Sequence, residues 1–256
     1  MKHKLYCFIV IAFISLRVNA QQFISKGTIE FEVTTNVKKT MSNNSWAEQL
    51  KDQIPTFKTA YYNFTFADNR SIYKFDHLDE KKAKIPEWIS NEVEDQNEWY
   101  YDFNTGQTTI QKNRWGSNFN IKDSICKIQW KLTNESRLIA GFNCRKAVGK
   151  ILDSVYVFAF YTDEITISGG PCTVNGLPGM ILGLTIPRLY VSMIATKISV
   201  TDVNEKSIKP ESSKKYYTNK ELKAILDEKT KDWYSNEEET EDSKNRKNQF
   251  YWQTLL

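Results

Sequence analysis

The chain has 256 residues, of which 40% are hydrophobic and 13% aromatic, and its formal net charge is +4 at pH 7. A chain of this length and composition can bury a substantial core and is compatible with one β-rich domain. The near balance of 35 basic and 31 acidic side chains is unlike the clustered basic surface of nucleic-acid-binding proteins. We therefore expect no nucleic-acid partner.

The first twenty residues have the pattern of a cleavable signal peptide. Lys2 and Lys4 precede an apolar run over residues 5–16, and Val18-Asn19-Ala20 offers small side chains to a signal peptidase. This run is too short to cross a bilayer, which takes about 20 residues, and no later run reaches that length. We expect an exported chain that begins near Gln21, is soluble after cleavage, and lies in the periplasm, cell envelope or extracellular space without a transmembrane segment.

Composition divides the chain into four parts. We expect residues 1–20 to be the signal peptide and residues 21–204 to form a single antiparallel β domain. Residues 205–234 are expected to form a C-terminal segment with a docking helix, and residues 235–256 a polar, flexible tail.

Period-two alternation predicts antiparallel strands in the first half of the β domain. At residues 28–34 every second side chain is apolar, as in a strand with one wet face. Two hairpins follow, one pairing residues 58–66 with 71–75 and one pairing residues 99–103 with 107–112.

Five further strands are predicted in the second half, at residues 125–132, 144–152, 155–162, 181–184 and 190–203. The segment 155–162 is apolar on both faces, which is typical of a central strand that is covered on both sides. The series amounts to roughly eight to ten strands. The expected fold is therefore mainly β, a strongly curved antiparallel sheet or open half-barrel with a few peripheral helices.

Two helices are predicted outside the strands. Ser45 and Glu48 form a capping-box pattern that begins a short helix, which Pro55 ends. Thr218 and Glu221 cap a second helix with one apolar stripe. The polar residues that follow are expected to be solvated, and the closing Phe-Tyr-Trp of residues 250–252 to form an edge strand or an exposed apolar tail.

The most distinctive segment is the loop Gly169–Leu184. Pro178 fixes φ at one corner of a turn, and Gly179 supplies the positive φ that a type II turn needs at its next corner. The apolar residues after this turn enter the core at once. Turn geometry explains the glycines, because the lysine and hydroxyl of a phosphate-binding loop are missing after them. The residues of this motif loop are Gly170, Pro171, Gly176, Leu177, Pro178 and Gly179.

In this segment the sequence resembles the GLPGLI family of exported proteins from Bacteroidetes-type bacteria. The motif stands here as residues 176–181 with Met180 in place of a leucine, and the resemblance extends upstream through residues 140–147, 161–165 and 170–171. The resemblance implies export and a β-rich fold similar to the lipoprotein-carrier (LolA-like) half-barrels, in which a curved sheet wraps an apolar cavity. It brings no established catalytic residues.

Three cysteines follow the signal peptide, Cys126, Cys144 and Cys172. In an oxidising compartment two of them can form a disulfide, and their spacing leaves every pairing open. Neither a CxxC redox pair nor a zinc knuckle is present.

The inventory for catalysis is poor. His77 is the one histidine after the signal peptide, and no G-x-S-x-G elbow is present, so a nucleophile would lack its usual base. Asp76-His77 with Asp79-Glu80 has ligand chemistry for a divalent ion, but the surrounding lysines favour a solvated loop. Asp163-Glu164 are better explained as a strand end than as paired catalytic carboxylates. We expect no enzyme activity, no cofactor and no metal.

Apolar ligand binding is the function that the sequence favours. The aromatic residues of two predicted strands can line a concave sheet, as in cavities that hold apolar ligands, although they can equally fill a closed core. These candidates are Tyr62, Phe64, Phe66, Tyr156, Phe158 and Phe160. The expected function is a binding or carrier module for an apolar ligand, lipid or peptide. The alternative is a structural or accessory protein that binds another envelope component, such as an outer-membrane transporter.

Overall fold

A computed structural model describes residues 23–40, 52–79, 81–82, 97–114, 117–152, 154–200, 203–234 and 240–256. The predicted signal peptide and most of the helix expected after Ser45 lie outside these ranges. The strands of the described residues form one sheet of eleven members. They are β1 (Gly27–Asn36), β2 (Phe57–Ala67), β3 (Arg70–Leu78), β4 (Glu98–Asp102), β5 (Gln107–Arg114), β6 (Ser117–Ser124), β7 (Gln129–Ile139), β8 (Phe142–Ile151), β9 (Val155–Thr162), β10 (Met180–Ile186) and β11 (Val191–Ser199).

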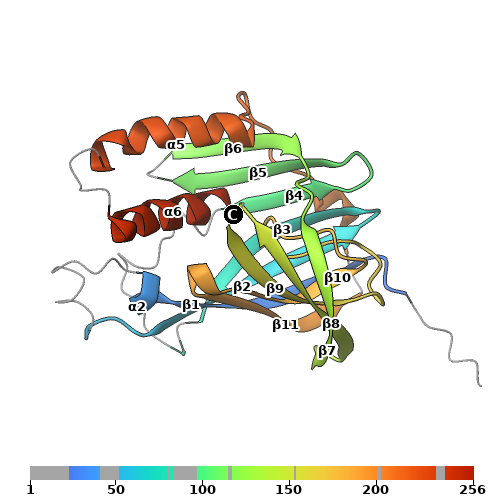
Figure 1. Cartoon of the computed structure of the whole chain (residues 1–256). Helices are drawn as coiled ribbons and strands as arrows, with labels where there is room; N and C mark the ends of the chain where they lie inside the picture. Colours follow the sequence, from blue (N-terminus) through green and yellow to red (C-terminus); the bar gives the residue numbers. More distant parts are fainter. Residues whose placement is uncertain are drawn as a thin grey trace, which may run out of the picture.

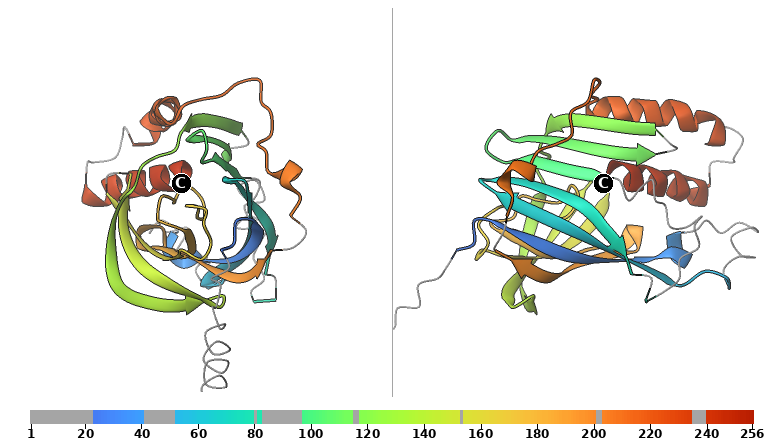
Figure 2. Two further views of the ribbon diagram at one scale, coloured as in Figure 1. Left: turned by 90° about the vertical axis from the view of Figure 1, so that its right-hand side faces the viewer. Right: turned by 180° about the vertical axis from the view of Figure 1, so that it is seen from behind.

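The sheet is antiparallel, open and strongly curved. Its order is β6-β5-β4-β3-β2-β1-β11-β10-β9-β8-β7, so two runs of neighbouring strands meet where β1 pairs with β11. The edge strands β6 and β7 follow each other in the chain but do not pair. Figure 2 (left) shows the sheet curling round the segment that joins β9 to β10. The expectation of a mainly β, curved, open antiparallel sheet is confirmed.

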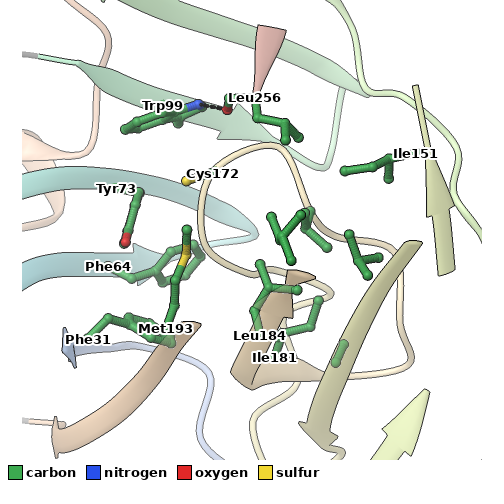
Figure 3. Packing of buried hydrophobic residues seen from close by; sticks show 14 of the residues in the cluster. Phe31, Phe64, Tyr73, Trp99, Ile151, Cys172, Ile181, Leu184, Met193 and Leu256 are labelled. Atoms are coloured by element: carbon green, nitrogen blue, oxygen red, sulfur yellow. Dashed lines mark hydrogen bonds between the residues drawn. The ribbon is translucent and has the colours of Figure 1, made fainter. Parts of the chain in front are cut away.

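Alternation along β1 shows why the concave face becomes the core. Ile29, Phe31 and Val33 point into the curve and are buried, whereas Glu30 and Glu32 between them lie on the outer face. Phe31 packs edge-on against Tyr73 of β3, with ring centroids 6.1 Å apart. The main hydrophobic cluster spreads from here over the inner faces of both runs of strands (Figure 3).

The prediction around residues 117–132 was wrong in its boundaries. The structure has two strands there, β6 and β7, and the predicted strand at 125–132 spans the connection between them. Phe119 and Ile121 are the only apolar residues of β6, so its alternation is too short to stand out. β6 is an edge strand, and the polar residues suit its exposed side.

The helices are α2 (Val37–Thr40), α5 (Asn219–Tyr234) and α6 (Glu241–Leu255), with 3-10 turns η2 (Pro187–Leu189) and η3 (Glu205–Ser207). The capping box of α5 is present: the Thr218 N–H donates to Glu221 Oε2 (2.7 Å), and the Glu221 N–H donates to Thr218 Oγ1 (3.2 Å). α5 packs against β6 and against α6 (Figure 1). None of the helices in the described ranges is long and apolar enough to span a bilayer.

The C-terminal residues differ from the expected flexible tail. Residues 241–255 form α6, whose N-cap Thr240 makes a capping box with Ser243. Tyr251 and Trp252 are buried in the main cluster, and the Tyr251 hydroxyl donates to Asp227 of α5 (2.6 Å). The aromatic residues that were expected to form an edge strand or exposed tail are therefore the apolar side of a helix. The polar residues before them concealed its pattern, because only about one turn of the stripe is apolar.

The motif loop lies inside the curve of the sheet. Leu177 and Val174 are almost fully buried, and the Ile181 N–H donates to Gly169 O (3.0 Å). Gly179 has the expected positive φ of 128°. The turn itself is tighter than the expected type II turn, because the Gly179 N–H donates to Leu177 O (2.8 Å) and closes a three-residue turn round Pro178.

Gly179→Ala is expected to destabilise the protein strongly. A Cβ at this position would lie 2.0 Å from Thr162 O, and the positive φ adds strain. We expect a loss of at least about 3 kcal/mol in the free energy of unfolding, measured by urea denaturation. Gly106→Ala is the matched control, because Gly106 has φ +68° but nothing within 4 Å of its Cβ, so the loss there should be about 1 kcal/mol. Equal losses in the two variants would contradict the close approach.

Candidate functional site

A cavity of about 540 Å³ opens at one end of the curved sheet. Its wall is formed where β1, β5 and β10 end and where β2, β4 and β11 begin, together with α2, η2 and the last residues of α6. Most of the lining is apolar, with Val33, Ile186, Leu189, Met193 and Leu256 as its main aliphatic contributors. This size is in the range of small-molecule sites, which is about 300–1,000 Å³.

α6 closes one side of this cavity. The Trp99 indole N–H on β4 donates to Leu256 O over 2.8 Å, and both residues are buried (Figure 3). Gln253 and Thr254 add polar atoms to the same wall. The cavity therefore depends on a contact between two segments that lie 157 residues apart.

Lys112 is the unusual member of the lining. It lies on β5 with Thr108 and Ile110 on the same inner face, and only 5% of its surface is exposed. Its Nζ lies 4.4 Å from the centroid of the Trp99 ring, a distance at which a cation is attracted by the aromatic face. Burial in this apolar setting lowers the pKa of Lys112 to about 8, because the charged form loses its hydration.

Cys172 brings a thiol to the cavity wall. It belongs to the motif loop and has a left-handed backbone with φ 53°. Burial raises the pKa of its thiol to about 12, although the neighbouring Lys112 acts in the opposite direction. The thiol is therefore protonated at neutral pH, and a protonated thiol is a weak nucleophile.

The structure does not bring the six predicted aromatic residues together. Tyr62 lines the cavity, whereas Phe64 and Phe66 are buried in the main cluster. The three residues from β9 lie on the opposite, outer face of the sheet, where Tyr156 is 56% exposed. Phe158 and Phe160 are shielded there by Lys146 and Arg137, which lie over their rings. The expected second layer over β9 is thus replaced by long cationic side chains from β7 and β8.

The other cysteines lie away from the cavity. Cys126 is exposed and Cys144 is buried, and the three cysteines of the described residues are free thiols in this structure. Of the motif residues, Gly176 and Pro178 are exposed and the others are buried.

The residues considered for a metal ion are also remote from the cavity. His77 is exposed on β3, stacked on Tyr61, and its Nδ1 lies 2.7 Å from Asp76 Oδ2. Glu80 lies outside the described residues. Within the described part of the chain no cluster of three or more His, Cys, Asp or Glu residues is arranged to hold a metal ion.

Sequence reasoning missed Lys112, Trp99 and Leu256 as site residues. The signal for Lys112 was present, because in the predicted strand 107–112 it falls on the same face as Thr108 and Ile110. A lysine on the apolar face of a strand is uncommon, since lysine is almost never fully buried. For Leu256 there was no signal, because its partner is remote in the sequence.

One family model matches more than half of this chain. The model of the N-glycanase peptide, N-terminal domain (PNGase F-II) matches residues 64–226, which is more than half of the chain. This chain belongs to that family. The PNGase F-II N-terminal domain match covers β3 to β11 and the first half of α5, and so includes Trp99, Lys112 and Cys172. It does not test the resemblance to the GLPGLI family.

Solved structures give distant likenesses. Two crystal structures of PNGF-II, in space groups P21 and C2, have TM-scores of 0.48 at 15% and 14% identity, over 75% and 78% of this chain. This chain spans only 32% of each PNGF-II chain. An uncharacterized conserved protein from Thermus thermophilus has a TM-score of 0.38 at 8% identity, over 82% of this chain and 99% of its own. None of the curated proteins compared with the chain matches it.

Lys112→Met is expected to stabilise the protein at pH 7. The folded-state pKa of Lys112 is lowered from 10.5 to about 8, which corresponds to a cost of roughly 3 kcal/mol that is fully present below pH 8. As pH rises from 8 towards 10.5, the folded protein gives up this proton first and the cost fades. The gain from the substitution should therefore be largest at pH 7 and shrink by about pH 9.5, measured by urea denaturation at both pH values.

The matched control for this measurement is Lys197→Met, on the exposed outer side of β11. It should change the free energy of unfolding by no more than about 0.5 kcal/mol at either pH. A Lys112→Met variant that is less stable than the unsubstituted protein at pH 7 would contradict the cost assigned to the buried ammonium group.

Proposed function

We propose that this chain is a non-enzymatic binding or carrier module that holds an apolar ligand, a lipid tail or a peptide segment in the cavity bounded by Trp99 and Leu256. The cavity carries the proposal, because it has the size of a small-molecule site and a wall in which a continuous set of aliphatic and aromatic side chains stands beside several polar groups. The proposal includes export of the chain, for which the support is the signal-peptide pattern of residues 1–20.

The chemistry of the lining favours binding over covalent catalysis. The Cys172 thiol has a pKa raised to about 12 and has no histidine among the described residues of the cavity wall to activate it. The PNGase F-II relatives are named for an N-glycanase, but this chain matches their N-terminal domain and spans about a third of the PNGF-II chains. We propose a binding role for that domain and no glycanase activity.

The proposal is tested by asking whether the cavity holds a bound molecule and whether the emptied cavity binds a probe. Organic extracts of the purified chain, examined by mass spectrometry, should contain an apolar molecule in stoichiometric amount. The extracted protein should bind the neutral fluorescent probe N-phenyl-1-naphthylamine with an increase in its emission. An extract without bound molecules, together with no change in the emission of the probe, would overturn the proposal.

Val191→Trp is expected to weaken binding of this probe at least about tenfold. Val191 lines the cavity at the start of β11, and the larger indole would occupy space that the ligand needs. Ile194→Trp on the outer face of the same strand, where the native side chain is 46% exposed, is the matched control and should bind as the unsubstituted chain does. Equal affinities in both variants would place the binding site elsewhere.

A second candidate function is that of an accessory protein that binds another envelope component. The edge strand β7 favours it, because Leu132 and Leu138 are 54% and 69% exposed on a strand with one unpaired side. A pull-down from envelope extract with the full chain should then recover a stoichiometric protein partner, and Leu138→Lys should abolish its recovery. Recovery of the same partner by the variant would exclude the β7 edge.

A further inference from the structure

Lys112 places a cation in a wall that is otherwise mainly apolar. Within the described part of the chain, no ion pair or hydrogen bond joins its Nζ to another residue, and the Nζ lies 4.4 Å from the centroid of the Trp99 ring, near the Cys172 thiol. A buried ammonium group without an anion is costly, because the apolar surroundings replace only a small part of its hydration. A ring face offsets that cost only in part, because a cation–π contact is weaker than the hydration that is lost.

Other basic side chains lie in or beside the described lining of the cavity. Lys58 is a second lysine in the lining, and the described lining residues include no aspartate or glutamate. Lys38 and Lys39 of α2 and Arg188 of η2 stand beside lining residues at the same end of the sheet. The described lining therefore offers an anion basic groups and no carboxylate.

The acidic residues next in sequence to two lining residues, Trp99 and Val33, point away from the cavity. Glu98 precedes Trp99 on β4 but lies on the outer face, where it pairs with Lys74 over 2.5 Å. Glu32 precedes Val33 on β1 and pairs on the outer face with Lys82 over 2.7 Å. Both carboxylates are used on the convex side of the sheet, and neither compensates Lys112.

We propose that the cavity binds a single-chain amphiphile with a carboxylate head, such as a fatty acid, with the head against Lys112 and the hydrocarbon chain against Ile186, Leu189 and Met193. This inference rests on the proposed function and names its ligand class. The carboxylate supplies the anion that Lys112 lacks, and the aliphatic wall receives the chain.

The experiment compares ligands of equal chain length and different head groups. Decanoate, decanol and decyltrimethylammonium are to be titrated as competitors of N-phenyl-1-naphthylamine bound to the full chain at pH 7, each below its micelle-forming concentration. We expect decanoate to bind about tenfold to a hundredfold more tightly than decanol, as a charge-assisted hydrogen bond allows, and the cationic amphiphile to bind most weakly. A parallel series with decyl phosphate separates a preference for carboxylate from a preference for any anion.

Lys112→Met should remove the preference for decanoate over decanol while leaving the affinity for decanol within about twofold, because the apolar wall is intact. Lys197→Met is the matched control and should keep the preference. Equal binding of decanoate and decanol by the unsubstituted chain, tighter binding of decyl phosphate than of decanoate, or a preference that persists in Lys112→Met, would each overturn the carboxylate assignment and leave the binding module standing. Failure of the probe and of all four amphiphiles to bind would instead overturn the proposed function and this inference with it.

Discussion

The fold depends on the loop between β9 and β10, which fills the inside of the curved sheet and is called the plug below. The segment between β9 and β10 runs inside the curved sheet, and its backbone approaches the end of β9 so closely that Gly179 leaves no room for a Cβ beside Thr162. Buried backbone must still satisfy its polar groups, and here the loop bonds to itself, as between Gly176 and Ser168. With this plug in place, the two runs of strands share one core without closing into a barrel.

The plug leaves space at one end of the sheet, and α6 determines the shape of that space. Trp99 connects α6 to the cavity, because its indole N–H donates to Leu256 O at the end of α6 while its ring lies against Lys112 in the cavity wall. A shift of α6 relative to β4 would therefore alter both the wall of the cavity and the surroundings of the Lys112 ammonium group. The site and the C-terminal helix are one structural unit, although they come from distant parts of the chain.

Lys112 in the cavity wall lowers the free energy of unfolding, because its charged group is buried; the apolar residues of the core carry no such cost. Lys112 lies on an inner face between residues that would suit an aliphatic side chain, and its pKa is lowered to about 8 for that reason. Proteins seldom retain such a group for stability, because replacing it with an apolar residue of similar volume is often neutral or stabilising. A strongly perturbed group in a concave site is a marker of function, and here it agrees with the geometry of the cavity.

The amino-acid sequence by itself determined the class of the fold and most of its strands. Alternation at residues 28–34 and the hairpin signals of the next two pairs depend on neighbouring residues, so they are visible locally. The positive φ at Gly179 followed in the same way from a Pro-Gly pair. The same local rules failed for β6 and for α6, whose polar sequences become ordered only through contacts with the rest of the chain.

Only the tertiary structure decided which aromatic residues meet and where the site lies. Alternation shows that Tyr156, Phe158 and Phe160 share a face, but period two is the same for either face of a strand. The sheet placed that face outside, and placed Tyr62 at the cavity with Lys112 and Trp99. The side of the sheet that becomes concave depends on the sum of all strand pairings and on the loop it encloses, and no single segment contains that information.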